Sequence, residues 1–121
     1  MTAFDQDLTL CSGDDRTLRF TITDDTGVPV NLTGMLAARW GCARLLANGN
    51  YVLPADVTKS LGSGVTLADA PGGVIEVAIT GVETSLLSKG RYHHELEMTD
   101  ADGAVSTLAM GVITLIEDLL A

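Results

Sequence analysis

The chain has 121 residues, of which 46% are hydrophobic and 19% are charged, so it can bury one core and is too apolar for intrinsic disorder. Sixteen acidic against seven basic residues give a net charge of -9, which disfavours nucleic acid and anionic membrane surfaces as partners. We therefore expect one folded domain over residues 1–121, made in the cytoplasm, with neither a membrane span nor a signal peptide.

Alternation of apolar and polar side chains predicts a series of short strands. Because successive side chains of a strand point to opposite faces, this alternation buries one face of each strand and leaves the other exposed to solvent. The predicted strands cover residues 7–11, 16–23, 35–42, 56–61, 65–67, 74–80, 91–99 and 104–116. The side chains expected to supply most of the core are Leu18, Phe20, Ile22, Leu36, Trp40, Ile75, Val77, Ile79, Leu96 and Met98.

Two Asp- and Gly-containing turns predict hairpins. Asp24 to Gly27 follows the second strand and leads into the extended residues 28–34, where Pro29 suits an edge or a connection. Asp100 to Gly103 joins the last two strands. Both patterns favour an antiparallel arrangement.

Two segments do not alternate. Residues 43–47 are good helix formers, so a helical start is an alternative there to a strand end before the turn at residues 48–50. Residues 82–90 predict a single helical turn, capped by Thr80 or a neighbour and closed by Gly90, that crosses between two sheets. Tyr92 then stands where a tyrosine corner would tie the strand start to the preceding loop.

Together these elements predict an all-β fold, an Ig-like antiparallel β-sandwich of about seven to nine strands in a single domain. The absence of alternating helices and strands in the sequence argues against a parallel sheet.

The sequence offers no convergent set of nucleophile, base and metal ligands, so we expect no catalytic, cofactor-binding or metal-binding residues and no enzyme activity. His93 and His94 are adjacent on a strand and point to opposite faces, one toward the core and one outward. The acidic turns are favoured as ordinary turn residues over Ca²⁺ ligands. Cys11 and Cys42 are favoured as buried thiols, with a disulfide as the first alternative.

The chain remains apolar past the point where its last strand should end. A strand with a fraying tail would explain this pattern, and so would a docking tail over residues 115–121. In the second case, the predicted interface residues are Leu115, Ile116, Leu119 and Leu120. Changing Leu119 and Leu120 to Ser should then leave the domain folded and weaken its assembly.

The order of turns and strands carries a resemblance over nearly the whole chain. It lies in residues 12–20 and 23–34, the Trp-bearing residues 37–40, the Gly-led strand starts at 64–67 and 72–75, and the closing segments 90–96, 99–103 and 111–115. This order resembles that of small β-sandwich virion proteins of tailed bacteriophages, including N-terminal domains of baseplate receptor-binding assemblies.

The resemblance implies a non-catalytic adaptor or attachment subunit in the tail, baseplate or fibre base of a virion. Its partners would be other virion structural proteins, in a homo-oligomer or ring within the particle. Two alternatives remain open at this point: a head-decorating or head-spike base protein, and a soluble intracellular ligand-binding β-sandwich.

Overall fold

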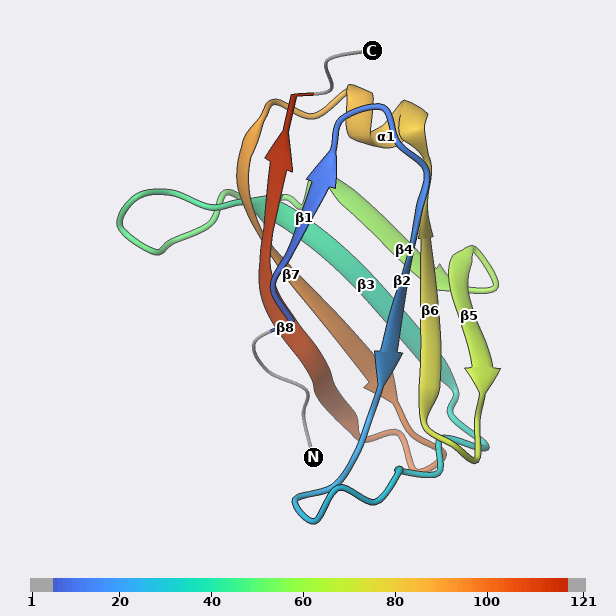
Figure 1. Cartoon of the computed structure of the whole chain (residues 1–121). Helices are drawn as coiled ribbons and strands as arrows, with labels where there is room; N and C mark the ends of the chain where they lie inside the picture. Colours follow the sequence, from blue (N-terminus) through green and yellow to red (C-terminus); the bar gives the residue numbers. More distant parts are fainter. Residues whose placement is uncertain (1–5, 118–121) are drawn as a thin grey trace.

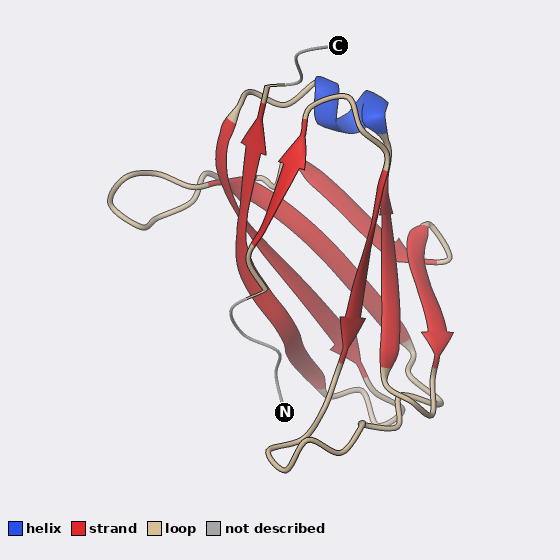
Figure 2. Cartoon of the chain, viewed as in Figure 1, coloured by secondary structure: helices blue, strands red, loops and turns tan. Residues whose placement is uncertain are grey.

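The computed structural model describes residues 6–117 and is built almost entirely from strands (Figure 2). This confirms the all-β prediction, and the eight strands fall within the expected number. The elements are β1 (Leu8–Cys11), β2 (Arg16–Thr21), β3 (Ala37–Arg44), β4 (Val57–Leu61), β5 (Gly64–Asp69), β6 (Val74–Ile79), α1 (Gly81–Ser85), β7 (Gly90–Thr99) and β8 (Val105–Ile116).

All eight strands belong to one sheet, in the order β1-β8-β7-β3-β4-β5-β6-β2. The sheet is rolled so far that it is nearly a barrel, and β2 and β6 lie in front of β3 and β7 in Figure 1. The predicted antiparallel pairing holds for five of the seven strand pairs, whereas β1 with β8 and β4 with β5 are parallel. The two facing sides of the sheet enclose a common core.

The core follows the predicted alternation with one error. Leu18, Phe20, Ile22, Trp40, Ile75, Val77, Ile79 and Leu96 are buried, and Met98 is partly buried against them. Leu36, by contrast, is 64% exposed. In an alternating pattern Leu36 would share the inward face with Ala38 and Trp40, but it lies just before the first residue of β3. Alternation assigns a side chain to a face of the strand, but it does not show how far along the strand that face is covered.

The crossing from β6 to β7 contains the predicted helical turn and its cap, but the turn ends at a C-cap at Leu86, and Gly90, predicted to close it, is the first residue of β7. Thr80 caps α1 by accepting a hydrogen bond from the Glu83 backbone N–H, and the Glu83 side chain closes a capping box. After the helix, the Tyr92 hydroxyl donates to the Ser88 carbonyl, which confirms the tyrosine corner. The two ends of this crossing join opposite sides of one rolled sheet, not two separate sheets.

The two acidic turns have the same internal structure. Asp24 Oδ1 accepts from the backbone N–H groups of Thr26 and Val28, and Asp100 Oδ1 accepts from those of Asp102 and Ala104. Each turn also contains a glycine at φ near +86°, Gly27 and Gly103, a conformation that side chains disfavour.

Only the second turn joins two full strands. After Gly27 the structure has a single bridge, between Thr23 and Pro29, in place of the predicted hairpin partner. Pro29 has no N–H to donate to a ladder, which fits its position in a connection.

Residues 45–55 form an arm that projects from the body (Figure 1). It begins where β3 ends at Arg44, and a bridge between Leu45 and Tyr51 closes its base. The alternative of a helical start at residues 43–47 is therefore wrong. Ala43 and Arg44 pair with His93 and Tyr92 across the sheet, and this pairing outweighs their helix propensity.

Candidate functional site

A groove with a volume of about 610 Å³ lies on the outer face of β4, β3 and β7. Its floor is smooth because Gly41 and Ala43 stand opposite Glu95 and His93 in the β3–β7 register. Tyr51 and Leu53 of the arm border one end of the groove. The groove thus arises where small residues on a sheet meet a projecting loop.

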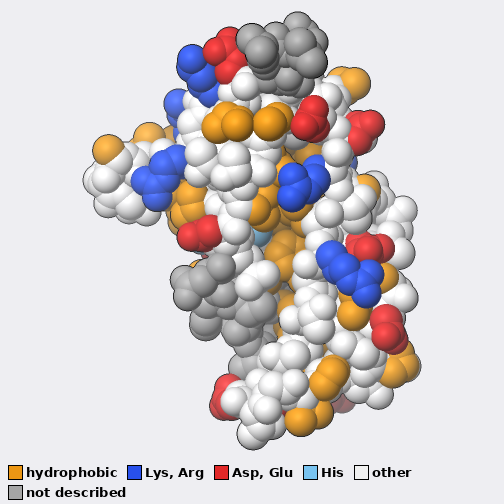
Figure 3. All heavy atoms as spheres, viewed as in Figure 1, with side chains coloured by type: hydrophobic (Ala, Val, Ile, Leu, Met, Phe, Trp, Pro, Cys, Tyr) orange, Lys and Arg blue, Asp and Glu red, His pale blue; other side chains and the backbone are white. Residues whose placement is uncertain are grey.

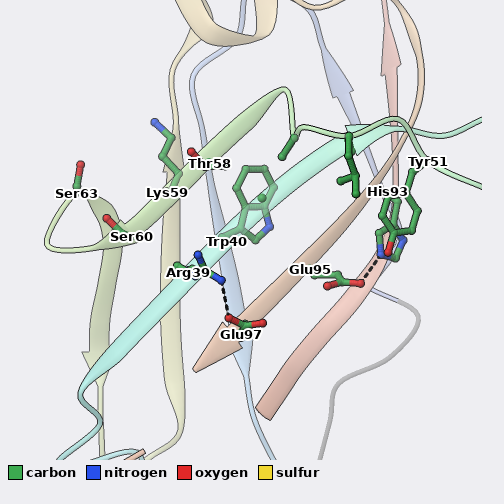
Figure 4. A pocket seen from close by; sticks show the side chains of 14 residues that line it. Arg39, Trp40, Tyr51, Thr58, Lys59, Ser60, Ser63, His93, Glu95 and Glu97 are labelled. Carbon is green, nitrogen blue, oxygen red and sulfur yellow. Dashed lines mark hydrogen bonds and ion pairs between the residues drawn. The ribbon is translucent and has the colours of Figure 1, made fainter. Parts of the chain in front are cut away.

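Charged and aromatic groups line the β7 side of this groove (Figure 4). Arg39 Nη2 lies 2.9 Å from Glu97 Oε1, and His93 Nε2 lies 2.8 Å from Glu95 Oε1. The Tyr51 and His93 rings are stacked, with centroids 4.6 Å apart and planes 11° from parallel. These contacts hold the imidazole between a carboxylate and an aromatic ring.

The hydroxyl groups of the groove lie on its other side. Figure 4 shows Thr58, Ser60 and Ser63 on the β4 side, whereas His93 and Glu95 lie on the β7 side. A nucleophilic hydroxyl needs a base within hydrogen-bond reach, and this arrangement does not bring the two together. The groove can bind a polar or aromatic group, but its geometry does not assemble a catalytic pair.

Lys59, on the β4 side of the groove, forms an ion pair with α1. Its Nζ lies 2.6 Å from the Glu83 carboxylate. This hydrogen bond, together with those from Thr80, lowers the pKa of Glu83. The same carboxylate closes the capping box of α1, so Lys59 joins β4 to the helix.

His94 lies on the inner face, directly behind the groove, and is fully buried. Trp40 Nε1 donates to His94 Nδ1 at 3.2 Å, and His94 Nε2 lies 2.7 Å from the Gln6 carbonyl oxygen. Because the indole can only donate, Nδ1 must be the acceptor, and the neutral ring then carries its proton on Nε2. Burial lowers the pKa of His94 and favours this neutral form.

The same network fixes the beginning of the described chain. The Gln6 N–H donates to the Met110 carbonyl, and Asp7 Oδ1 accepts from the Val112 N–H. Gly111 lies between them, where an added Cβ would come within 2.5 Å of the Gln6 backbone. His94 therefore serves packing and strand attachment, which confirms that one of the two adjacent histidines is in the core and hydrogen-bonded.

The cysteines are both free thiols. Cys42 is buried, which raises its pKa to about 12, so it is a poor nucleophile at neutral pH. Cys11 is only half-buried, contrary to the expectation that both are inaccessible. No group of three or more His, Cys, Asp or Glu side chains within residues 6–117 is arranged to hold a metal ion.

The structure corrects part of the predicted C-terminal interface. Leu115 is 2% exposed and packs in the core of its own domain, so it is unavailable for docking. Ile116, the next residue, is 42% exposed. Leu119 and Leu120 lie outside the described residues, and their role stays a prediction.

Among the exposed apolar residues that sequence reasoning missed, the largest group lies on the arm. Leu46, Tyr51, Val52 and Leu53 are all exposed, Leu53 by 71%. The signal was present in the sequence, where apolar residues flank an Asn-Gly turn without an alternating pattern that would bury them. Further exposed apolar side chains are Val82 on α1 and Leu86 at its C-cap.

Comparisons with known proteins give no family for this chain. No protein-family model matches it, and no curated protein matches it either. In the described part of the structure, no helix has the length and apolar character needed to span a membrane. The site must therefore be interpreted from its own geometry.

Proposed function

We propose that this protein is a non-catalytic structural subunit that docks on other protein chains, as an adaptor in the tail, baseplate or fibre base of a phage or phage-derived particle. The observation that carries the docking role is the arm, which projects from the body (Figure 1) and carries exposed large apolar side chains. Clusters of this kind on soluble proteins mark interaction surfaces.

The arm is well suited to this role because its base is fixed. Leu45 N–H donates to the Arg91 carbonyl, and Val52 N–H donates to the Arg44 carbonyl, both at 2.9 Å. Tyr51 is further held by its stack on His93. A loop anchored to a sheet loses little conformational entropy on binding, so more of its apolar contact contributes to affinity.

The virion setting rests on the resemblance of the turn and strand order to small phage β-sandwich proteins. The all-β fold and the tyrosine corner are compatible with that resemblance. A head-decorating protein has the same requirements for docking, and we favour the tail, baseplate or fibre base because the resemblance includes domains of baseplate assemblies.

A ligand-binding β-sandwich is the second candidate, and the groove favours it. The Tyr51–His93 stack next to Glu95 could receive a small polar ligand with a flat face. This function would need the groove and not the tip of the arm.

The experiment compares incorporation of two double variants into particles. Leu46→Ser with Leu53→Ser removes apolar surface from the arm. Val82→Ser with Leu86→Ser, in α1 and at its C-cap, is the control, and these side chains are at least as exposed, at 72% and 81% against 42% and 71%. We expect the arm variant to fold normally and to be at least tenfold depleted from purified particles, and the control to be retained. Mass spectrometry of separated heads and tails measures both occupancy and location.

Three results would contradict the proposal. The wild-type protein could be missing from particles, the arm variant could be incorporated as well as the wild type, or the α1 variant could be the depleted one. Recovery with heads instead of tails would support the head-decorating alternative.

A further inference from the structure

Charge is unevenly distributed over this molecule. The connections at the end opposite α1 are residues 22–36, 70–73 and 100–104 (Figure 1). Together with Asp69, the last residue of β5, they contain no Lys or Arg and carry five carboxylates, at Asp24, Asp25, Asp69, Asp100 and Asp102. We call this region the acidic end. All seven basic residues of the chain lie elsewhere.

The acidic end also exposes apolar side chains. Val28, Leu36 and Val105 are each more than half exposed. Leu36 and Val105 both adjoin Thr99, because the Leu36 N–H donates to the Thr99 carbonyl and Val105 pairs with Thr99. Apolar and acidic side chains also occur together near this end in Figure 3. This region is therefore an apolar surface with a negative rim.

The arm has the opposite character at its base. Arg44 and Arg91, both exposed, flank the point where the arm leaves the sheet, and their carbonyls hold the arm through Val52 and Leu45. The Arg44 guanidinium lies over the Tyr92 ring, 6.0 Å from its centroid, and the exposed Asp56 accepts a hydrogen bond from the Arg44 N–H at the same base. With two arginines and one aspartate, the base of the arm has a net positive charge, whereas the acidic end has only negative charges.

We infer that the acidic end of one copy of this chain docks on the arm of a second copy, in a head-to-tail contact. Leu36 and Val105 would pack against Leu46 and Leu53, with Asp25 and Asp102 facing Arg44 and Arg91. Asp25 and Asp102 suit this contact because their carboxylates make none of the turn hydrogen bonds, which Asp24 and Asp100 accept. Both halves of the interface are present on one chain, which favours a second copy over an unrelated partner.

The contact joins two different surfaces, so every copy keeps one unused acidic end and one unused arm. Such heterologous contacts add further copies and produce a ring if the rotation closes or a filament if it does not. This inference deepens the proposed function, because it assigns the arm to contacts between copies within the particle.

The test uses two double variants of the full chain, each with a matched control. Asp25→Lys with Asp102→Lys disables the acidic end, and its control is the same charge reversal at Asp14 and Glu117, near α1. Leu46→Ser with Leu53→Ser disables the arm, and its control is Val82→Ser with Leu86→Ser. Sedimentation velocity over a concentration series measures self-association.

We expect the wild type and both controls to form oligomers, and each disabled variant to associate at least tenfold more weakly. An equimolar mixture of the two disabled variants should form dimers and nothing larger, because each supplies the surface that the other lacks. Circular dichroism confirms that the variants are folded.

A wild-type chain that remains monomeric at about millimolar concentration would overturn the inference, as would disabled variants that associate normally or a mixture that forms no dimer. These results are distinguishable from failure of the proposed function. A monomeric chain that still enters particles through its arm keeps the adaptor role and loses only the self-contact.

Discussion

The inner and outer faces of β3 and β7 consist of alternate residues of the same two strands, yet the inner face forms part of the core and the outer face lines an open groove. On the inner face, Trp40 and His94 are buried, hydrogen-bonded to each other and closed to solvent. On the outer face, Gly41 and Ala43 leave a groove whose ion pairs are open to water. The comparison teaches that one strand pair can hold the fold together and present a surface independently, because successive side chains point to opposite faces of the sheet.

The largest effect should come from the inner face, through Trp40→Ala. Removing a buried indole leaves a cavity and an unsatisfied His94, so we expect a loss of about 3 to 5 kcal/mol in the free energy of unfolding. Trp40→Phe keeps most of the volume and removes only the donor, at a cost of about 1 to 3 kcal/mol. Urea unfolding followed by circular dichroism measures both, and a loss below about 1 kcal/mol for Trp40→Ala would contradict its place in the core.

An intermediate effect is expected from pH, again through the inner face. Because burial lowers the pKa of His94 below its ordinary value of 6.5, the unfolded chain binds a proton at mildly acidic pH that the folded chain does not. The stability that comes from neutral His94 is therefore complete above pH 6.5. Below that pH it should fall by up to about 1.4 kcal/mol per pH unit, until the folded ring is itself protonated.

The control for this pH effect is the residue next to His94. Unfolding in urea at pH 7.5, 6.5 and 5.5 should show the loss in the wild type and in His93→Gln, whose ring lies on the outer face. His94→Gln should reduce the pH dependence. An equal dependence in His94→Gln and the wild type would show that the effect does not come from His94 and would refute this prediction.

The smallest effect belongs to the outer face. Arg39 is exposed at its ion pair with Glu97, and solvent screens such pairs strongly. We expect Arg39→Ala and Glu97→Ala each to change stability by less than about 1 kcal/mol, with a coupling in the double variant of about 0.5 kcal/mol or less. A coupling above about 2 kcal/mol in a double-mutant cycle would mean that solvent does not screen this pair, contrary to the open outer face described above.

Much of the fold could be predicted from local pattern. Alternation located the strands, and turn chemistry located Gly27 and Gly103, because both depend on residues a few positions apart. The capping of α1 and the tyrosine corner at Tyr92 are also short-range, so a single sequence was sufficient to find them.

Features that depend on how distant segments meet could not be predicted in this way. Leu36 was assigned to the core and Leu115 to the surface, and both assignments are wrong. The alternating pattern gives the direction in which a side chain points, but only the placement of neighbouring segments decides whether that side chain is buried. The groove likewise requires Gly41, His93 and Tyr51 to meet, and they come from three separate parts of the chain.

The sequence by itself thus determined the fold class, the turns and the alternating faces, because period two and turn chemistry are local properties of the backbone. Only the tertiary structure decided the rolled single sheet, the two parallel pairs, the arm and the separation of the acidic end from the basic residues. These features depend on strand order and register, which are set by burying one common core from residues far apart in the chain.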